Sequence, residues 1–166
     1  MKRLFYVFAC LSAMMLLAGC GASRQLSNSA TGKFQYEIEG VSNGTQGSYL
    51  VKVWSYSATK NANVEVCKRN AVHGVIFKGY AGSGQVRPQN PLVREPGAEA
   101  KYADYFYSFF ASGGEFNRYV TVTYGSQEIV KVGKQYKVGL VVSVSKDQLR
   151  KALEDAGIIK SLSHGF

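Results

Sequence analysis

The chain has 166 residues, of which 46% are hydrophobic, and a formal charge of +9 at pH 7. That length allows one domain with a real core. After the first three residues the basic side chains are scattered, with Lys68-Arg69 and Arg150-Lys151 as the only adjacent pairs. This scatter does not favour a nucleic-acid-binding patch, so we expect a solvated basic surface near anionic lipid or glycan, and no nucleic acid partner.

The N-terminus has the pattern of an export signal. Lys2 and Arg3 precede an uncharged run of fifteen residues, Leu4 to Ala18. As a helix this run would reach about 22 Å, which is short against a bilayer core of about 30 Å. A secretory signal peptide fits better than a membrane span. An ordinary cleaved signal that happens to contain Cys20, and a short signal anchor, are the alternatives.

The end of this run is Leu17-Ala18-Gly19-Cys20. It resembles the lipobox of bacterial prolipoproteins. The resemblance implies that the Cys20 thiol is acylated with diacylglycerol, that a dedicated peptidase cuts before Cys20, and that acyl chains such as palmitate then anchor the protein in the lipid bilayer. We therefore predict a signal peptide over residues 1–19. Because each buried CH₂ contributes about 0.8 kcal/mol, two or more chains anchor firmly.

The residues after Cys20 bear on the destination. Gly21 and Ala22 follow it, with no Asp at the second mature position and no acidic run. By resemblance to Gram-negative lipoproteins, this favours an outer-membrane anchor that faces the periplasm. Residues 20–32 are then the lipidated Cys20 and a small, polar, flexible tether, averaging about 20 Å end to end. A single domain is expected over 33–166.

Maturation also changes the charge and the cysteine content. Loss of Lys2 and Arg3 takes the Lys+Arg count from 20 to 18 against 11 acidic residues, which gives a mature charge of +7. Cys10 leaves with the signal and Cys20 is lipidated, so Cys67 alone remains and no intramolecular disulfide is possible. We interpret Cys67 as a small buried hydrophobe.

The domain begins with a predicted β-hairpin. Residues 34–39 alternate strictly, with Phe34, Tyr36 and Ile38 on one face and the polar side chains on the other. A turn containing Asn43-Gly44 leads to a second strand over 49–56. Trp54 lies in this strand; it is a candidate ligand platform, although a place in the core is favoured.

A helix follows, capped by Asn61 or Asn63. Its predicted inner face is spaced 3, 4 and 4 residues apart: Val64, Cys67, Ala71 and Val75. The segment 75–77 either ends this helix or begins a short strand.

Residues 80–97 hold all three prolines. So long a connection is unusual in a compact domain and is often functional or mobile. It is our first candidate for partner contact, with Arg87 and Arg94 as candidate binding residues. An inert surface excursion is the alternative.

A second helix is predicted over 98–112, ending at Gly113-Gly114. Five aromatic residues form its apolar face, and we favour core packing over a ligand shelf for them: Tyr102, Tyr105, Phe106, Phe109 and Phe110. Tyr107 lies off this face and is a candidate exposed binding residue.

Strands are predicted over 116–124 and 136–144, with a turn-rich connection or hairpin arm over 127–135. The 136–144 segment is apolar on both faces, which indicates a strand that is central or covered on both sides. Ser145 and Gln148 match a capping box for a last helix that buries Leu149, Ala152, Leu153 and Ala156 and ends at Gly157. The apolar tail residues are expected to dock back on the domain: Ile158, Ile159, Leu162 and Phe166.

The sequence offers no convincing catalytic group. The histidines are His73 and His164, and His73 is about 240° around a helix from Cys67. Glu37 and Glu39 share a solvent face, and two carboxylates alone do not make a glycosidase. No cluster has zinc-ligand spacing, and the glycine-rich segment 79–84 lacks the Gly-Lys-Ser/Thr of a phosphate loop. We predict no enzyme, no metal site and no cofactor; an enzyme with Cys67 as nucleophile is the remaining catalytic hypothesis.

These patterns predict an α+β domain, with a mainly antiparallel sheet and about three helices packed largely on one face. The leading functional hypothesis is a non-enzymatic outer-membrane lipoprotein: an adaptor or accessory subunit of an envelope assembly of secretion or surface-transport type, with an envelope protein as partner. The alternative is a glycan- or peptidoglycan-binding lipoprotein that uses Trp54, Tyr107 and the 80–97 loop.

Overall fold

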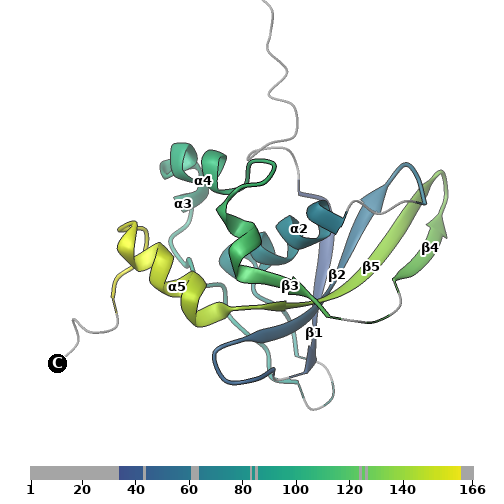
Figure 1. Ribbon diagram of the computed structural model, residues 1–166, viewed down its shortest axis with the longest axis horizontal. Coiled ribbons are helices and arrows are strands. Elements are labelled where there is room, and N and C mark those ends of the chain that lie inside the picture. The colour runs from purple at the N-terminus through teal and green to yellow at the C-terminus, as the bar shows by residue number, and fades with distance from the viewer. Residues whose placement is uncertain are drawn as a thin grey trace, which may run out of the picture.

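The computed structural model describes residues 34–42, 44–60, 64–82, 84, 86–123, 125 and 127–161. This part of the chain is an antiparallel sheet with helices, which confirms the α+β class (Figure 1). The strands are β1 (Tyr36–Ser42), β2 (Tyr49–Ser57), β3 (Val120–Val122), β4 (Glu128–Val132) and β5 (Gln135–Val144). The helices are α2 (Val64–Phe77), α3 (Ala98–Lys101), α4 (Ala103–Phe109), α5 (Lys146–Asp155) and the 3₁₀ helix η1 (Glu115–Tyr119).

Strands β2 and β5 form the centre of the sheet. The order is β1-β2-β5-β3, and β4 pairs with the half of β5 that β3 does not reach. The predicted hairpin is confirmed, because β1 and β2 pair antiparallel with Ile38 opposite Val53. The central position predicted for 136–144 is also confirmed, since β5 pairs with β2 along nine residues from Tyr136 to Val144.

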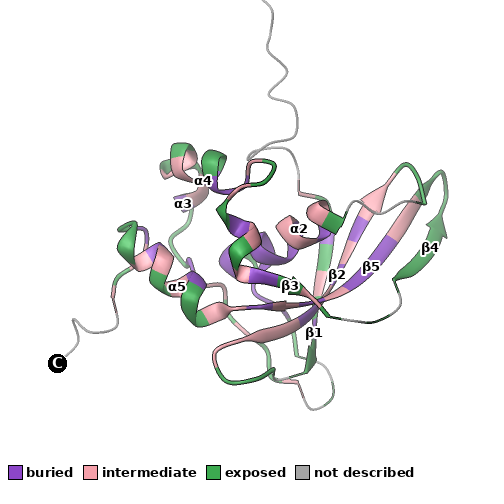
Figure 2. Cartoon of the chain, viewed as in Figure 1, coloured by how far each residue is buried: buried purple, intermediate pink, exposed green. Residues whose placement is uncertain are grey.

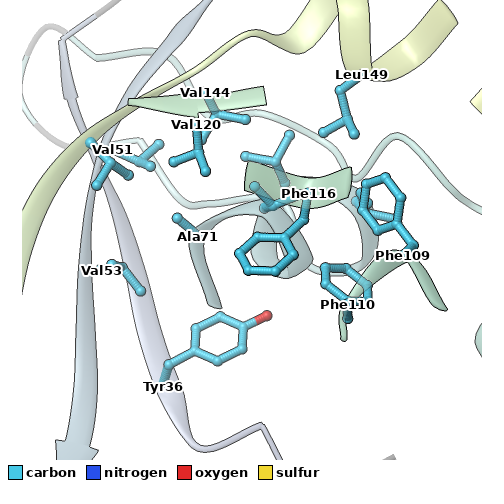
Figure 3. Close-up of a cluster of buried hydrophobic side chains, with 14 of the residues drawn as sticks. Tyr36, Val51, Val53, Ala71, Phe109, Phe110, Phe116, Val120, Val144 and Leu149 are labelled. Carbon is cyan, nitrogen blue, oxygen red and sulfur yellow. The ribbon is translucent and has the colours of Figure 1, made fainter. Parts of the chain in front are cut away.

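One face of the sheet carries the core. The inner-facing residues of β2 and β5 are buried against α2, which lies across the sheet (Figures 1 and 2). Figure 3 shows the rings of Phe109, Phe110 and Phe116 beside this layer, with Ala71 of α2 between them and β2. A fully buried phenylalanine contributes about 1.5–3 kcal/mol, so these rings make up a large share of the hydrophobic stabilisation.

Helix α2 agrees with its prediction except at its first turn. Cys67, Ala71 and Val75 are buried as expected, and residues 75–77 are helical rather than a strand. Val64 is 42% exposed, so its place on the inner face was predicted wrongly. Val64 is the first residue of α2. The candidate caps Asn61 and Asn63 lie outside the described residues.

The helix predicted over 98–112 is broken in two. Tyr102 has φ −110° and ψ 35°, which is not helical, and it separates α3 from α4. The break separates the turn that carries Glu99 from the turns that carry the aromatic rings. Phe106, Phe109 and Phe110 are fully buried, which confirms core packing for this face.

The strand predicted over 116–124 is wrong in its first half. Residues 115–119 form η1, and the strand β3 that pairs with β5 covers Val120–Val122. The alternation of this segment suggested a strand, but burying the Phe116 ring beside Phe110 favours a tight turn at this point. The 127–135 segment contains the hairpin arm β4, and all five residues of β4 are exposed.

Helix α5 is confirmed, but its capping box is not. Ser145 makes no side-chain bond to the helix end. The amide of Asp147 donates instead to the carbonyl of Gly47 at 3.1 Å, so the β1–β2 turn satisfies this end. The helix ends at Asp155, and Gly157, two residues further on, has a φ of 70° that suits glycine. Leu149 and Leu153 are buried, Ala152 is half-buried, and Ala156 is exposed, contrary to its prediction.

The segment after α5 packs on the domain, as expected. Ile158 is buried and Ile159 is half-buried against the core. Leu162 and Phe166 lie outside the described residues.

Candidate functional site

Trp54 lies on the outer face of the sheet, the face away from α2. It projects over Gly139 of β5, where an added Cβ would come within 2.7 Å of the indole ring. Only a glycine allows this close approach. The indole Nε1 donates a hydrogen bond to Glu39 at 3.0 Å. The favoured core position for Trp54 is therefore wrong: the residue is half-buried on the opposite side of the sheet from the core.

Two lysines flank the Trp54 ring. Lys52 Nζ is 4.4 Å and Lys137 Nζ 5.0 Å from the ring, both within cation–π range. Lys52 is bound to Glu128 at 2.5 Å and Lys137 to Glu37 at 2.6 Å.

The hydrogen bond from Lys137, followed by one from the Tyr56 hydroxyl, lowers the pKa of Glu37. Each lysine around Trp54 thus has a carboxylate partner, and the indole is enclosed by its own neighbours. A sugar ring would have to displace these contacts in order to stack on Trp54.

A second cluster is centred on the buried His73 of α2. The Tyr36 hydroxyl is 2.6 Å from His73 Nδ1, and His73 Nε2 is 3.3 Å from Glu99. The ring of Phe34 stacks on the imidazole at a centroid distance of 3.7 Å. A neutral imidazole protonated on Nε2 satisfies both bonds, since it accepts from Tyr36 and donates to Glu99. Residues from β1, α2 and α3 are joined in this way.

Burial dominates the electrostatics of this cluster. Burial, and then the nearby charge of Lys78, lower the pKa of His73 to about 3. Burial also raises the pKa of Tyr36 and of Glu99. Tyr36 therefore stays a phenol and His73 stays neutral at pH 7. The hydrogen bonds of this cluster can orient its side chains, but the cluster holds no ready nucleophile. It borders a cavity of about 710 Å³ lined also by Phe77, Lys78 and the 91–100 segment.

Cys67 is buried, as predicted. It is 1% exposed and its pKa is raised by burial. A thiol is reactive only as the thiolate, so this environment does not suit a nucleophile.

A further cavity is a groove between two segments that are far apart in the sequence. One wall is residues 88–95, and the other is the start of α5 with residues 158–160. Figure 1 shows the connection between α2 and α3 running alongside α5. The volume is about 870 Å³, within the range of small-ligand sites. Tyr49 donates to Gln89 Oε1 at 2.8 Å and so fixes one part of the lining. We call this cavity the basic groove.

Cations outnumber anions in the basic groove. The four basic residues are Arg94, Lys146, Arg150 and Lys160, and the two acidic ones are Glu95 and Asp147. Glu95 is bound by Lys101 at 2.9 Å, and Asp147 by Lys146 at 3.0 Å. Arg150 Nε lies 2.9 Å from Glu154, which is outside the lining.

Two cations of the groove remain without a carboxylate. Among the described residues, Arg94 and Lys160 make no ion pair, and they come from opposite walls. The arrangement suits an anion held between two segments.

The four predicted binding residues do not form one site. Trp54 is on the outer face of the sheet, and Tyr107 is 51% exposed on α4. Arg94 lines the basic groove, whereas Arg87 is exposed in the same connection but outside the lining. Arg94 is therefore the predicted residue that the structure places in a cavity.

The sequence did not predict most residues of the His73 cluster or of the basic groove. Alternation had placed Tyr36 on the inner face, but no spacing links it to His73 and Glu99. Arg150 lies in the predicted last helix and Lys160 beyond its end, and the scatter of basic residues indicated only a solvated surface. These residues are brought together by the tertiary fold.

Cys20 lies outside the described residues, so its acylation stays a prediction. No helix in the described ranges is long and apolar enough to cross a membrane. Across the same ranges, no three His, Cys, Asp or Glu side chains gather into a potential metal site.

Comparison with known proteins found no match: no family model, no curated protein and no solved structure is similar to this chain.

Proposed function

We propose that this chain is a lipid-anchored, non-enzymatic subunit of a cell-envelope assembly, of secretion or surface-transport type. The observation that carries the proposal is Leu17-Ala18-Gly19-Cys20 at the end of a short, positively flanked apolar run. Acylated Cys20 holds the domain at the outer membrane, facing the periplasm, and an envelope protein is its partner.

The chemistry of the domain supports a binding role over a catalytic one. Cys67 and His73 are buried. Burial raises the pKa of the Cys67 thiol and lowers the pKa of the His73 imidazole, so both side chains are held in their neutral forms. The cluster around Trp54 satisfies its own charges. The basic groove is left as a cavity with charges available to a second molecule.

Glycan recognition has less support. Stacking on a sugar needs an open aromatic face, and Trp54 lies against Gly139 and two lysines. Tyr107 is open, but a single exposed tyrosine is common on protein surfaces.

Replacing the predicted acyl acceptor tests the anchor. We expect Cys20→Ala to abolish incorporation of an alkyne-tagged palmitate and to move the protein from membranes into the soluble fraction. Cys10→Ala is the matched control, because Cys10 lies within the predicted signal and should leave labelling unchanged. Retention of the Cys20→Ala protein on membranes after a high-salt wash would count against the anchor.

Crosslinking in native membranes tests the partner. We expect one envelope protein to be recovered in constant ratio to the wild-type chain, and to be lost with Cys20→Ala. If labelling and fractionation support the anchor but no stoichiometric partner is recovered, the subunit role is wrong while the lipoprotein assignment stands.

A further inference from the structure

We propose that the basic groove is a binding site for a phosphate-bearing amphiphile, such as the headgroup and first acyl carbons of an anionic phospholipid. The inference goes beyond the subunit role, because it assigns a ligand class to a cavity that the anchor does not involve.

The charge of the groove selects an anion. Its lining carries four cations and two anions, and the outside partners Lys101 and Glu154 cancel each other, so a net charge of +2 remains. Arg94 and Lys160 supply this excess from opposite walls. Two cations on opposite walls match the charge of a phosphate monoester, close to −2 at neutral pH, better than the single charge of a carboxylate.

Polar donors add to the charge. Tyr49 donates its hydroxyl proton to Gln89 Oε1, which leaves the amide nitrogen of Gln89 as a donor in the lining. A phosphate has several acceptor oxygens and can use such a donor beside the two cations.

The rest of the lining selects an amphiphile over a fully polar anion. Leu92 is half-buried on one wall, and Ile158 and Ile159 are on the other, with two prolines beside them. An acyl or glyceryl portion would cover this apolar surface and remove it from water, which is favourable. The volume of about 870 Å³ accommodates a headgroup with a few carbons, not two whole acyl chains.

Binding to soluble probes tests the inference. The full chain, purified in a non-ionic detergent, is titrated with dihexanoyl phosphatidic acid, dihexanoyl phosphatidylcholine and inorganic phosphate, and binding is measured by microscale thermophoresis. We expect phosphatidic acid to bind at least tenfold more tightly than either of the others. The zwitterionic lipid offers no excess charge to the cations, and inorganic phosphate leaves the apolar wall uncovered.

Variants locate the site. Arg94→Gln and Lys160→Gln should each weaken phosphatidic acid binding about tenfold, because each removes a positively charged hydrogen-bond donor to the phosphate. Arg118→Gln and Lys131→Gln are the matched controls: both residues are exposed, away from the groove, and should leave binding unchanged. Ile159→Ser should weaken phosphatidic acid binding and leave phosphate binding unchanged. Circular dichroism checks that each variant is folded.

Four outcomes would overturn the proposal. The first is no phosphatidic acid binding at millimolar concentration, and the second is equal loss in the groove variants and the controls. The third is equal affinity for inorganic phosphate and phosphatidic acid, which would assign the groove to free phosphate compounds. A synthetic acidic peptide that binds more tightly than phosphatidic acid would likewise replace the lipid by a protein ligand. None of these results depends on Cys20, so the anchor is tested separately.

Discussion

The two faces of the sheet bury their side chains by different physical means. On the inner face, apolar residues of β2 and β5 pack against α2 and the rings that follow it, and the one imidazole there is held neutral. On the outer face, Trp54 is covered by lysines whose charges are matched by Glu37 and Glu128. The first arrangement is strong and intolerant of charge. The second is weaker in each contact and sensitive to salt.

The largest effect is expected on the inner face. Phe110→Ala should lower the free energy of unfolding by about 4 kcal/mol, because the ring is fully buried among Phe106, Phe109 and Phe116 and its loss leaves a cavity. Urea denaturation measures this loss. Tyr107→Ala is the control on the neighbouring helix, expected within about 0.5 kcal/mol of wild type since Tyr107 is exposed. Equal losses in the two variants would contradict the described packing.

The next effect is a dependence on pH carried by His73. Its pKa is about 3 in the folded protein and 6.5 when exposed, so the unfolded chain binds the proton first as the pH falls. The stability that the neutral, buried His73 allows is fully present above pH 6.5, and it is lost progressively as the pH falls towards 3. Between pH 7 and pH 4 the loss amounts to about 3 kcal/mol, from 1.36 kcal/mol per pKa unit.

His73→Gln is the matched variant for this measurement. Glutamine can still bond to Tyr36 and does not titrate, so the variant should start less stable and lose about 3 kcal/mol less than wild type between pH 7 and pH 4. Denaturant midpoints at each pH provide the comparison. Parallel pH curves for the two proteins would show that His73 does not carry the dependence.

A third change tests the close approach on the outer face. Gly139→Ala places a methyl group 2.7 Å from the Trp54 ring, and the resulting strain should cost about 2 kcal/mol. A shift of tryptophan fluorescence should accompany the loss, because the indole has to move from its lysine neighbours. Gly125→Ala is the control, since its Cβ would meet nothing closer than 3.9 Å.

The smallest effect concerns the outer ion pair. Lys137→Gln should cost about 0.5 kcal/mol, the range of a surface ion pair, and the cost should shrink as salt is added. A double-mutant cycle with Glu37→Gln isolates the coupling. A coupling above about 2 kcal/mol that is insensitive to salt would make this face as rigid as the core, and the contrast between the two faces would be lost.

Periodicity predicted most of the fold. The alternation of β1, the helical spacing of α2 and the aromatic face before Gly113 reported burial correctly, with Val64 as the exception, because each reflects contacts within one element. Tyr102 and Phe116 were different. Tyr102 breaks a helix whose apolar face continues past it. The Phe116 ring is buried from the 3₁₀ helix η1 rather than from a strand.

The sites were less predictable than the fold. Arg94 was selected from the length of its loop, and it does line the groove, but Lys160 comes to the groove only through the docking of the segment after α5. Trp54 was selected for its type alone. Whether an aromatic ring is open or covered depends on what lies above it, and here that is decided by lysines from two different strands.

The stack of Phe34 on His73 has a mechanical consequence. Any pull from the N-terminal side of the chain enters the described fold at Phe34 and passes to Tyr36, and both residues are held by the same imidazole. Acid that charges His73 would loosen that point of entry before it disturbs the centre of the sheet. The force needed to peel β1 from β2 should therefore decrease as the pH is lowered, while the β2–β5 pairing behind it keeps its strength.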